Sequence, residues 1–268
     1  MAELMKTALE TSTMDQPDAL IAVETVSVRF GGILAIDNVS FTLAPGELLG
    51  LIGPNGAGKT TMLRCITGAR PADAGRVLLA GRDLSQLGVA ARARLGVALT
   101  HQIVRPFRSL SVLDNVTLAV GHMQLVTPVT AFFNAARQQQ RARALELLEQ
   151  VGIADWASAP AGTLPLGALK RLEVARALAI EPQVLLLDEP LAGLNQAEAA
   201  RLGACLNDLN RGGITMILIE HNISQVLQLC SRLVVLDNGR KIADGAPRAV
   251  LADPIVISAY IGREVAHA

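Results

Sequence analysis

The sequence predicts an α/β fold with a mainly parallel sheet and an antiparallel patch of strands near the N-terminus. The runs Val184–Leu187 and Ile214–Ile219 are almost continuously apolar, which is typical of parallel strands covered on both faces. Residues 21–30 instead alternate apolar and polar side chains, and the alternation returns over residues 39–43. That pattern indicates half-buried antiparallel strands. Because helical patterns separate the later strands, the fold class is α/β.

The remaining elements follow in chain order. Pro45-Gly46 predicts a turn, and Leu48–Ile52 predicts a buried strand that enters a glycine-rich loop. Residues 131–151 have the apolar spacing of a helix. One face of a later helix is formed by Ile223, Val226, Leu227 and Cys230. Finally, Asp237-Asn238-Gly239 predicts a hairpin turn.

The composition excludes several classes of protein. With 51% hydrophobic and 18% charged residues among 268, one large domain with a full core is expected and global disorder is excluded. The 24 basic and 24 acidic residues cancel, so no nucleic-acid partner is expected. The three scattered cysteines, Cys65, Cys205 and Cys230, indicate neither a disulfide framework nor a zinc site.

Neither a secretory signal nor a membrane-spanning helix is expected. The first twenty residues carry four acidic side chains and lack an apolar core. The longest uncharged run, Asn115–Ala136, contains too many polar residues to span a membrane. The chain is therefore not expected to cross a membrane, and its unpaired cysteines favour a reducing cytosol.

The strongest motif is a loop with the pattern GxxxxGK[ST] between a predicted strand and a predicted helix. Its glycines let backbone N–H groups point at phosphate oxygens, and the helix that follows adds its positive end. Lys59 supplies a mobile charge and Thr60 a hydroxyl ligand for Mg²⁺. The alternative is a chance glycine-rich turn, which the strand–loop–helix context disfavours. The predicted phosphate-binding residues are Gly53, Pro54, Asn55, Gly56, Ala57, Gly58, Lys59, Thr60 and Thr61.

Two carboxylates, Asp188 and Glu189, follow the apolar run Val184–Leu187. A parallel strand would deliver them to its carboxyl end, the edge at which the phosphate loop also opens. There Asp188 can orient Mg²⁺, and Glu189 can polarise the water that attacks a γ-phosphate. Two acids after a strand are a weak signal alone, but behind a phosphate loop they become a strong one.

With these motifs the chain resembles the ABC ATPase family over nearly all of residues 21–253. The resemblance implies an ATP-hydrolysing P-loop core with an antiparallel β subdomain and an inserted α-helical subdomain over roughly residues 103–171. Residues 1–20 then form an N-terminal tail and residues 254–268 a C-terminal tail.

Further positions match motifs of that family in the family's order. Gln102 matches the Q-loop glutamine, which contacts Mg²⁺ and signals to membrane subunits, and residues 167–178 match the signature helix from Gly167 onward. Residues 192–195 resemble the D-loop. His221 matches the switch histidine that contacts the γ-phosphate, and Phe30 matches the aromatic that stacks on adenine. A lone Phe or His is more often structural, but five elements in family order make coincidence negligible.

Within that family the chain looks most like the ATP-binding subunits of branched-chain amino-acid importers, although importers of amides and urea use similar cassettes. The similarity is carried by residues 28–32, 192–195, 219–222 and 239–262. Two positions depart from the family pattern. The signature serine is replaced by Pro165, and the D-loop serine by Leu191. The resemblance thus implies an intact phosphate site in this chain and a weakened contribution to its partner's site.

The resemblance also implies partners. Two cassettes would sandwich two ATP molecules with Mg²⁺, each site combining one chain's phosphate loop with the other's signature. Closure would move two transmembrane permease subunits, served by a periplasmic or extracellular solute-binding protein, with the cassette at the cytoplasmic face of the inner membrane. Because the resembled importers commonly use two different cassettes, the second ATPase subunit is expected to be a different chain.

Two alternatives to this function remain. An ABC ATPase of DNA repair or of ribosomes would carry a long coiled-coil insertion or tandem cassettes, and neither pattern is visible in the sequence. A weakly hydrolysing regulatory cassette is suggested by Pro165, whereas Glu189 and His221, the expected catalytic residues, favour hydrolysis. Substrate choice in such importers lies in other subunits, so the sequence does not specify the solute.

Overall fold

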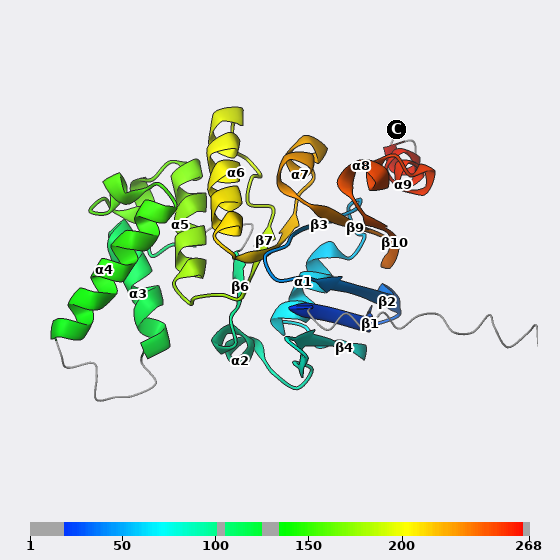
Figure 1. Cartoon of the computed structure of the whole chain (residues 1–268), viewed down its shortest axis with the longest axis horizontal. Helices are drawn as coiled ribbons and strands as arrows, with labels where there is room; N and C mark the ends of the chain where they lie inside the picture. Colours follow the sequence, from blue (N-terminus) through cyan, green and yellow to red (C-terminus); the bar gives the residue numbers. More distant parts are fainter. Residues whose placement is uncertain (1–18, 101–104, 125–133, 265–268) are drawn as a thin grey trace, which may run out of the picture.

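The computed structural model of the chain describes residues 19–100, 105–124 and 134–264, and it contains two sheets and a helical lobe (Figure 1). The smaller sheet is antiparallel and has the strand order β2-β1-β4-β5. Its strands are β1 (Ile21–Phe30), β2 (Ile33–Leu43), β4 (Ala74–Leu79) and β5 (Arg82–Asp83). The antiparallel subdomain predicted from the alternating N-terminal pattern is therefore confirmed.

The larger sheet has six strands in the order β10-β9-β3-β8-β7-β6. Its neighbouring strands are parallel except for β10, which pairs antiparallel with β9. The strands are β3 (Leu48–Ile52), β6 (Val97–Thr100), β7 (Val184–Asp188), β8 (Thr215–Ile219), β9 (Arg232–Asp237) and β10 (Arg240–Gly245). The two continuous apolar runs thus form β7 and β8, and the predicted hairpin turn joins β9 to β10.

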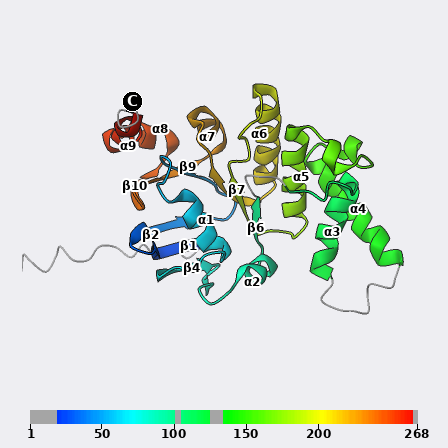
Figure 2. The same cartoon turned by 180° about the vertical axis from the view of Figure 1, so that it is seen from behind.

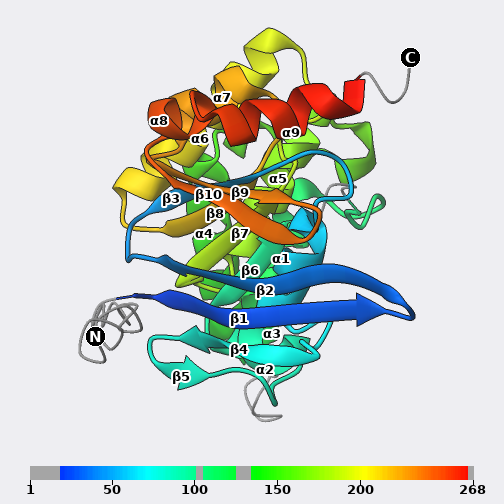
Figure 3. The same cartoon turned by 90° about the vertical axis from the view of Figure 1, so that its right-hand side faces the viewer.

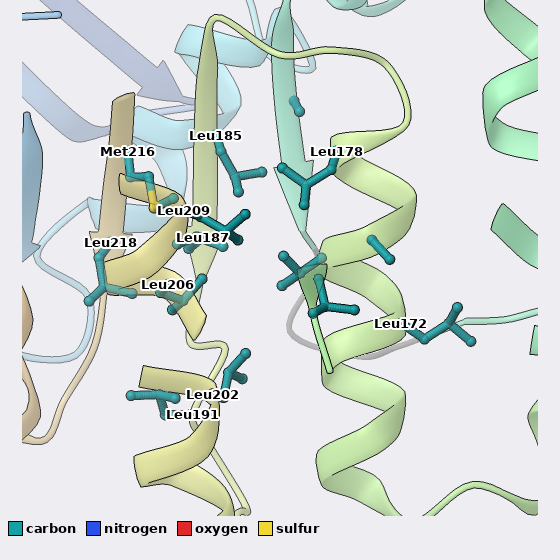
Figure 4. Packing of buried hydrophobic residues seen from close by; sticks show 14 of the residues in the cluster. Leu172, Leu178, Leu185, Leu187, Leu191, Leu202, Leu206, Leu209, Met216 and Leu218 are labelled. Carbon is teal, nitrogen blue, oxygen red and sulfur yellow. The ribbon is translucent and has the colours of Figure 1, made fainter. Parts of the chain in front are cut away.

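The central strands of the larger sheet, β3, β7 and β8, are buried on both faces. Successive side chains of a strand point to opposite faces of the sheet. Val184 and Leu186 of β7 lie in a core shared with α1 (Lys59–Thr67) and the smaller sheet. Leu185 and Leu187 lie in the other core, with α5 (Leu166–Leu178) and α6 (Gln196–Arg211). Figure 4 shows this second core, in which leucines of α5 and α6 meet β7 and β8. Burial on both faces explains why the strand reads as a continuous apolar run.

The helical lobe lies at the end of the molecule away from α8 and α9, as Figures 1 and 2 both show. It contains α3 (Val112–Gln124), α4 (Asn134–Gln150), two short 3-10 helices (Ala154–Trp156 and Ala161–Thr163) and α5. The helix expected over residues 131–151 thus corresponds to α4. The expected lobe boundary at residue 171 falls inside α5. Because α5 packs on both α4 and α6, this helix connects the lobe to the larger sheet.

The C-terminal part adds α7 (Ile223–Leu229), α8 (Pro247–Leu251) and α9 (Pro254–Glu264). In Figure 3, α8 and α9 lie against the β9–β10 hairpin. Residues 254–264, which the sequence sets apart as part of a tail, therefore form a helix, and its Val256 is buried. A further short helix, α2 (Val89–Arg94), precedes β6. In the part of the chain that the structure describes, no helix combines the length and apolarity needed to cross a bilayer.

Candidate active site

The phosphate loop joins the end of β3 to the start of α1, as predicted, and its glycines adopt conformations that other residues avoid. Gly53 has φ 146° and Gly58 has φ 103°. A Cβ atom at Gly53 would overlap the carbonyl oxygen of Leu236, and one at Gly58 would lie 2.7 Å from the carbonyl oxygen of Ala35. The loop can therefore curl tightly only with glycine at these two positions.

The first turn of α1 presents backbone N–H groups that suit an anion. The first N–H groups of a helix have no acceptor within that helix, and the N-cap residue of α1, Gly58, has no side chain to satisfy them. Lys59 is buried, and its Nζ donates to the carbonyl oxygens of Gly53 (2.7 Å) and Pro54 (3.0 Å). The loop thus places its own ammonium group beside the N-terminus of α1. This arrangement fits the phosphates of a nucleotide.

Glu189 and His221 form a hydrogen-bonded pair at the end of β7. The Nε2 atom of His221 lies 2.6 Å from Oε1 of Glu189, and their side chains are 45% and 18% exposed. Glu189 has φ 50°, and its N–H donates to the carbonyl oxygen of Ile219 on β8 (3.0 Å). A left-handed backbone at a residue other than glycine is costly and is maintained only where the surroundings fix it.

One cleft brings the loop and the pair together. Its walls are formed by the predicted residues Asn55, Gly56, Ala57, Gly58, Lys59, Thr60, Thr61, Glu189 and His221, together with Ala35 of β2. Asp188, half-buried, is the last residue of β7 and pairs in register with Ile219. Gln102 lies outside the described residues. The cleft therefore combines an anion site with a carboxylate–imidazole pair, which suits the transfer of a phosphoryl group to water.

Phe30 is the last residue of β1, and the residue is 45% exposed. The guanidinium of Arg70 lies 5.1 Å from the ring centroid, and it also donates to the carbonyl oxygen of Arg29 (2.8 Å) and pairs with Asp73 (3.1 Å). Arg70 therefore holds the ring in place from one side. The exposed remainder of the ring is consistent with the predicted role of stacking on a base.

We expect Phe30→Ala to weaken ATP affinity by about ten-fold or more, because base–aromatic stacking is worth about 1–3 kcal/mol. Titration calorimetry on the purified chain measures this directly. Phe107→Ala is the matched control, since Phe107 is also exposed and also lies beside an arginine, Arg176 (5.8 Å), but in the helical lobe. Equal affinities in the Phe30 variant and the parent would show that Phe30 has only a structural role.

Gly167 and Pro165 lie at the N-terminus of α5, outside this cleft. Pro165 is the N-cap residue, and its carbonyl oxygen accepts from the N–H groups of Ala168 and Leu169, both at 3.0 Å. No side chain caps the helix. Gly167 is buried beside Glu198 of α6, and a Cβ atom there would lie 3.1 Å from the Glu198 side chain. Gly167 is thus not among the residues that line the cleft beside this chain's phosphate loop.

Ala35 lines the cleft and Glu220 directly precedes His221, and neither is among the residues predicted for the site. Glu220 is 4% exposed, and burial raises the pKa of its carboxyl group. Its Oε1 accepts from the N–H of Leu191 (2.7 Å), so it joins the residue after β8 to the segment after β7. Glu220 could have been found from the sequence, because it is a carboxylate that directly precedes His221. Ala35 has no functional group that would mark it in a sequence.

Comparisons with known proteins agree with this geometry. The family described as "ABC transporter" matches residues 36–192, and the family described as "Branched-chain amino acid ATP-binding cassette transporter" matches residues 240–266. The chain is 40% identical over 256 residues to the high-affinity branched-chain amino acid transport ATP-binding protein LivG of Escherichia coli strain K12, covering 93% of this chain and 99% of that protein. It is 36% identical to BraF of Pseudomonas aeruginosa, a protein of the same description (91% and 98% covered).

A third relative is the lipopolysaccharide export system ATP-binding protein LptB of Escherichia coli strain K12, at 34% identity (92% and 98% covered). Among solved structures, a nucleotide-free ATP-binding cassette from an ABC transporter is similar with a TM-score of 0.80 and 30% identity (90% and 98% covered). The ADP conformation of the cassette MJ1267 gives 0.81 and 31% (91% and 99% covered). The chain therefore belongs to the ABC transporter family, and it is one of that family's ATP-hydrolysing, ATP-binding subunits.

Proposed function

We propose that this cassette powers the import of branched-chain amino acids. The observation that carries the proposal is the match of residues 240–266 to the branched-chain amino acid family, combined with the similarity to LivG and BraF over nearly their whole lengths. The similarity to LptB supports the assignment as an ATP-binding cassette. It does not support import, since LptB is described as part of an export system.

In the proposed reaction, the phosphates of ATP lie along the N-terminus of α1 with Lys59 beside them. Glu189 accepts the proton of the attacking water, and His221 holds the Glu189 carboxylate through the 2.6 Å hydrogen bond and contacts the γ-phosphate. Thr60 in the first turn of α1 and Asp188 at the end of β7 offer the oxygen ligands that Mg²⁺ prefers. When bound there, Mg²⁺ neutralises charge on the phosphates.

The proposed assembly contains a second, different cassette, two transmembrane permease subunits and a solute-binding protein, with this chain at the cytoplasmic face of the membrane. A mainly apolar groove between the ends of α1, α2 and β6 on one side and α5 on the other supports docking of a permease. Val89, 52% exposed, and Ala93 line it from α2, and Ala177 and Ile180 line it from the α5 side. Because the groove joins the ATPase core to the lobe, a partner seated there would respond to movement between them.

The proposal is tested by measuring ATP hydrolysis in the assembled transporter with its solute-binding protein. Saturating that protein with leucine, isoleucine or valine should stimulate hydrolysis several-fold, whereas urea or short amides should not. Stimulation by urea or amides alone would reassign the solute class while leaving the ATPase function in place.

A further inference from the structure

A buried lysine of the signature helix contacts the backbone of the catalytic glutamate. Lys170 is the fifth residue of α5, and the residue is only 5% exposed. Its Nζ donates to the main-chain oxygen of Glu189 at 3.2 Å. In Figure 4, α5 runs beside β6, and the next strand of the sheet is β7, which ends directly before Glu189. The contact therefore joins two segments that are distant in the sequence.

This contact completes the anchoring of the Glu189 backbone. The N–H of Glu189 donates to the carbonyl oxygen of Ile219 on β8 (3.0 Å). The carbonyl oxygen of Glu189 accepts from Nζ of Lys170 and from the N–H of Ala192, both at 3.2 Å. With its N–H and its carbonyl oxygen both held in this way, Glu189 keeps φ 50°, a conformation that persists only where the surrounding structure fixes it. Loss of the Lys170 contact would leave this carbonyl oxygen with the Ala192 N–H, a donor only three residues along the chain, and would remove the hydrogen bond that ties it to α5.

The charges around Lys170 explain why an ammonium group is retained there. Burial lowers the pKa of Lys170, and the neighbouring carboxylates of Glu220, Glu189, Glu173 and Asp188 oppose that shift. A buried cation is tolerated when carboxylates surround it. Lys170 thus lies near the acidic groups at the ends of β7 and β8 and near Glu173 of its own helix.

We propose that Lys170 is a positioning residue that couples the signature end of α5 to Glu189 in the same chain. Gly167, which faces a partner's nucleotide in the proposed dimer, is three residues before Lys170, about 4.5 Å along the helix axis. A shift of α5 caused by the partner's nucleotide would therefore move the group that holds Glu189. The inference rests on the proposed dimer, but the Lys170–Glu189 link itself does not.

The test compares turnover and ATP binding in the assembled transporter. Lys170→Met should lower kcat by about 10–100-fold, the usual effect of a misplaced catalytic group, with ATP affinity unchanged within about two-fold. In a Glu189→Gln background the same change should add less than about three-fold, because residues acting as a unit are not additive. Leu172→Ala is the control on the same helix. Leu172 is fully buried on the side of α5 away from β7, so its loss should lower stability and leave kcat of the folded protein unchanged (Figure 4).

The competing interpretation is that Lys170 only neutralises Glu220. In that case the double variant Lys170→Met/Glu220→Gln, which removes both charges and protects folding, would recover parental turnover and overturn the proposal. Equal losses in the parent and Glu189→Gln backgrounds would overturn it as well. Turnover in the double variant that stays well below that of Glu220→Gln alone supports the proposal.

Hydrogen–deuterium exchange on the nucleotide-free full chain separates this link from the transport function. Lys170→Met should speed exchange over residues 189–192 by about ten-fold, as expected for one lost hydrogen bond, whereas Leu172→Ala should not. Unchanged exchange there would overturn the proposal even in a working importer. If leucine fails to stimulate hydrolysis, the proposed solute is contradicted. The exchange result would still decide whether Lys170 holds the Glu189 backbone.

Discussion

Glu189→Gln is expected to slow ATP hydrolysis by about 10²–10⁴-fold, the usual contribution of a positioned general base, while ATP binding stays at the parental level. The amide of glutamine cannot take a proton from water, but it has the same volume and can still accept a hydrogen bond from His221. The 2.6 Å contact and the left-handed backbone should therefore survive the substitution.

Single-turnover hydrolysis in the assembled transporter and nucleotide titration together measure this effect. Glu146→Gln is the matched control, because Glu146 lies on the surface of α4 with its side chain 60% exposed. Near-parental hydrolysis by the Glu189 variant would remove Glu189 from the role of base. A parallel loss of ATP affinity would indicate a folding defect instead.

The second large effect concerns Pro165. Its presence in the signature predicts that one of the transporter's two ATP-hydrolysis sites is strong and the other weak. A signature serine would supply both a helix cap and a hydroxyl for the partner's γ-phosphate, and Pro165 supplies neither. Losing one hydrogen bond to a charged group costs about 1.5–3 kcal/mol, which slows a site by ten-fold or more. The strong site is then the one built on this chain's phosphate loop and the partner's signature.

Separate inactivation of the two catalytic glutamates tests the asymmetry. Glu189→Gln should abolish most turnover of the complex, whereas the equivalent change in the partner cassette should cost far less. In the Glu189→Gln background, Pro165→Ser should raise the remaining turnover by about ten-fold, since it restores one charged hydrogen bond. Pro165→Ala is the control, because it restores an N–H without a hydroxyl. Equal losses from the two glutamates would leave Pro165 as a tolerated helix-start proline.

The sequence predicts well those parts of the site whose residues are contiguous. The phosphate loop and the Asp188–Glu189 pair each lie between a strand and the next segment, so the end of one strand fixes where they go. The sequence does not specify the strand order, and the Glu189–His221 contact depends on β7 and β8 being neighbours in the parallel sheet. What could not be predicted is how α5 lies against this edge, since Lys170 and Glu189 meet only through packing of the leucine core between the helix and the sheet.

The spacing of apolar residues predicts burial less reliably in helices that are short or lie at the surface. Leu148 and Val151 of the helix expected over residues 131–151 are buried, but Leu145 is 39% exposed. Likewise, Val226 and Cys230 are buried while Leu227 is 42% exposed. Apolar spacing indicates a face, but the width of that face depends on which neighbours cover it. The same holds for α9, whose Val256 is buried in a helix that packs on the β9–β10 hairpin.

Uptake of radiolabelled leucine by the reconstituted transporter tests the central claim most directly. Vesicles that contain the permease subunits and both cassettes, supplied with ATP on the cassette side and the solute-binding protein on the other, should accumulate leucine. The same vesicles with Glu189→Gln should bind ATP and accumulate little or none. Parental accumulation with the Glu189 variant, or no leucine uptake by the parent complex under conditions where it hydrolyses ATP, would contradict an importer of branched-chain amino acids driven from this site.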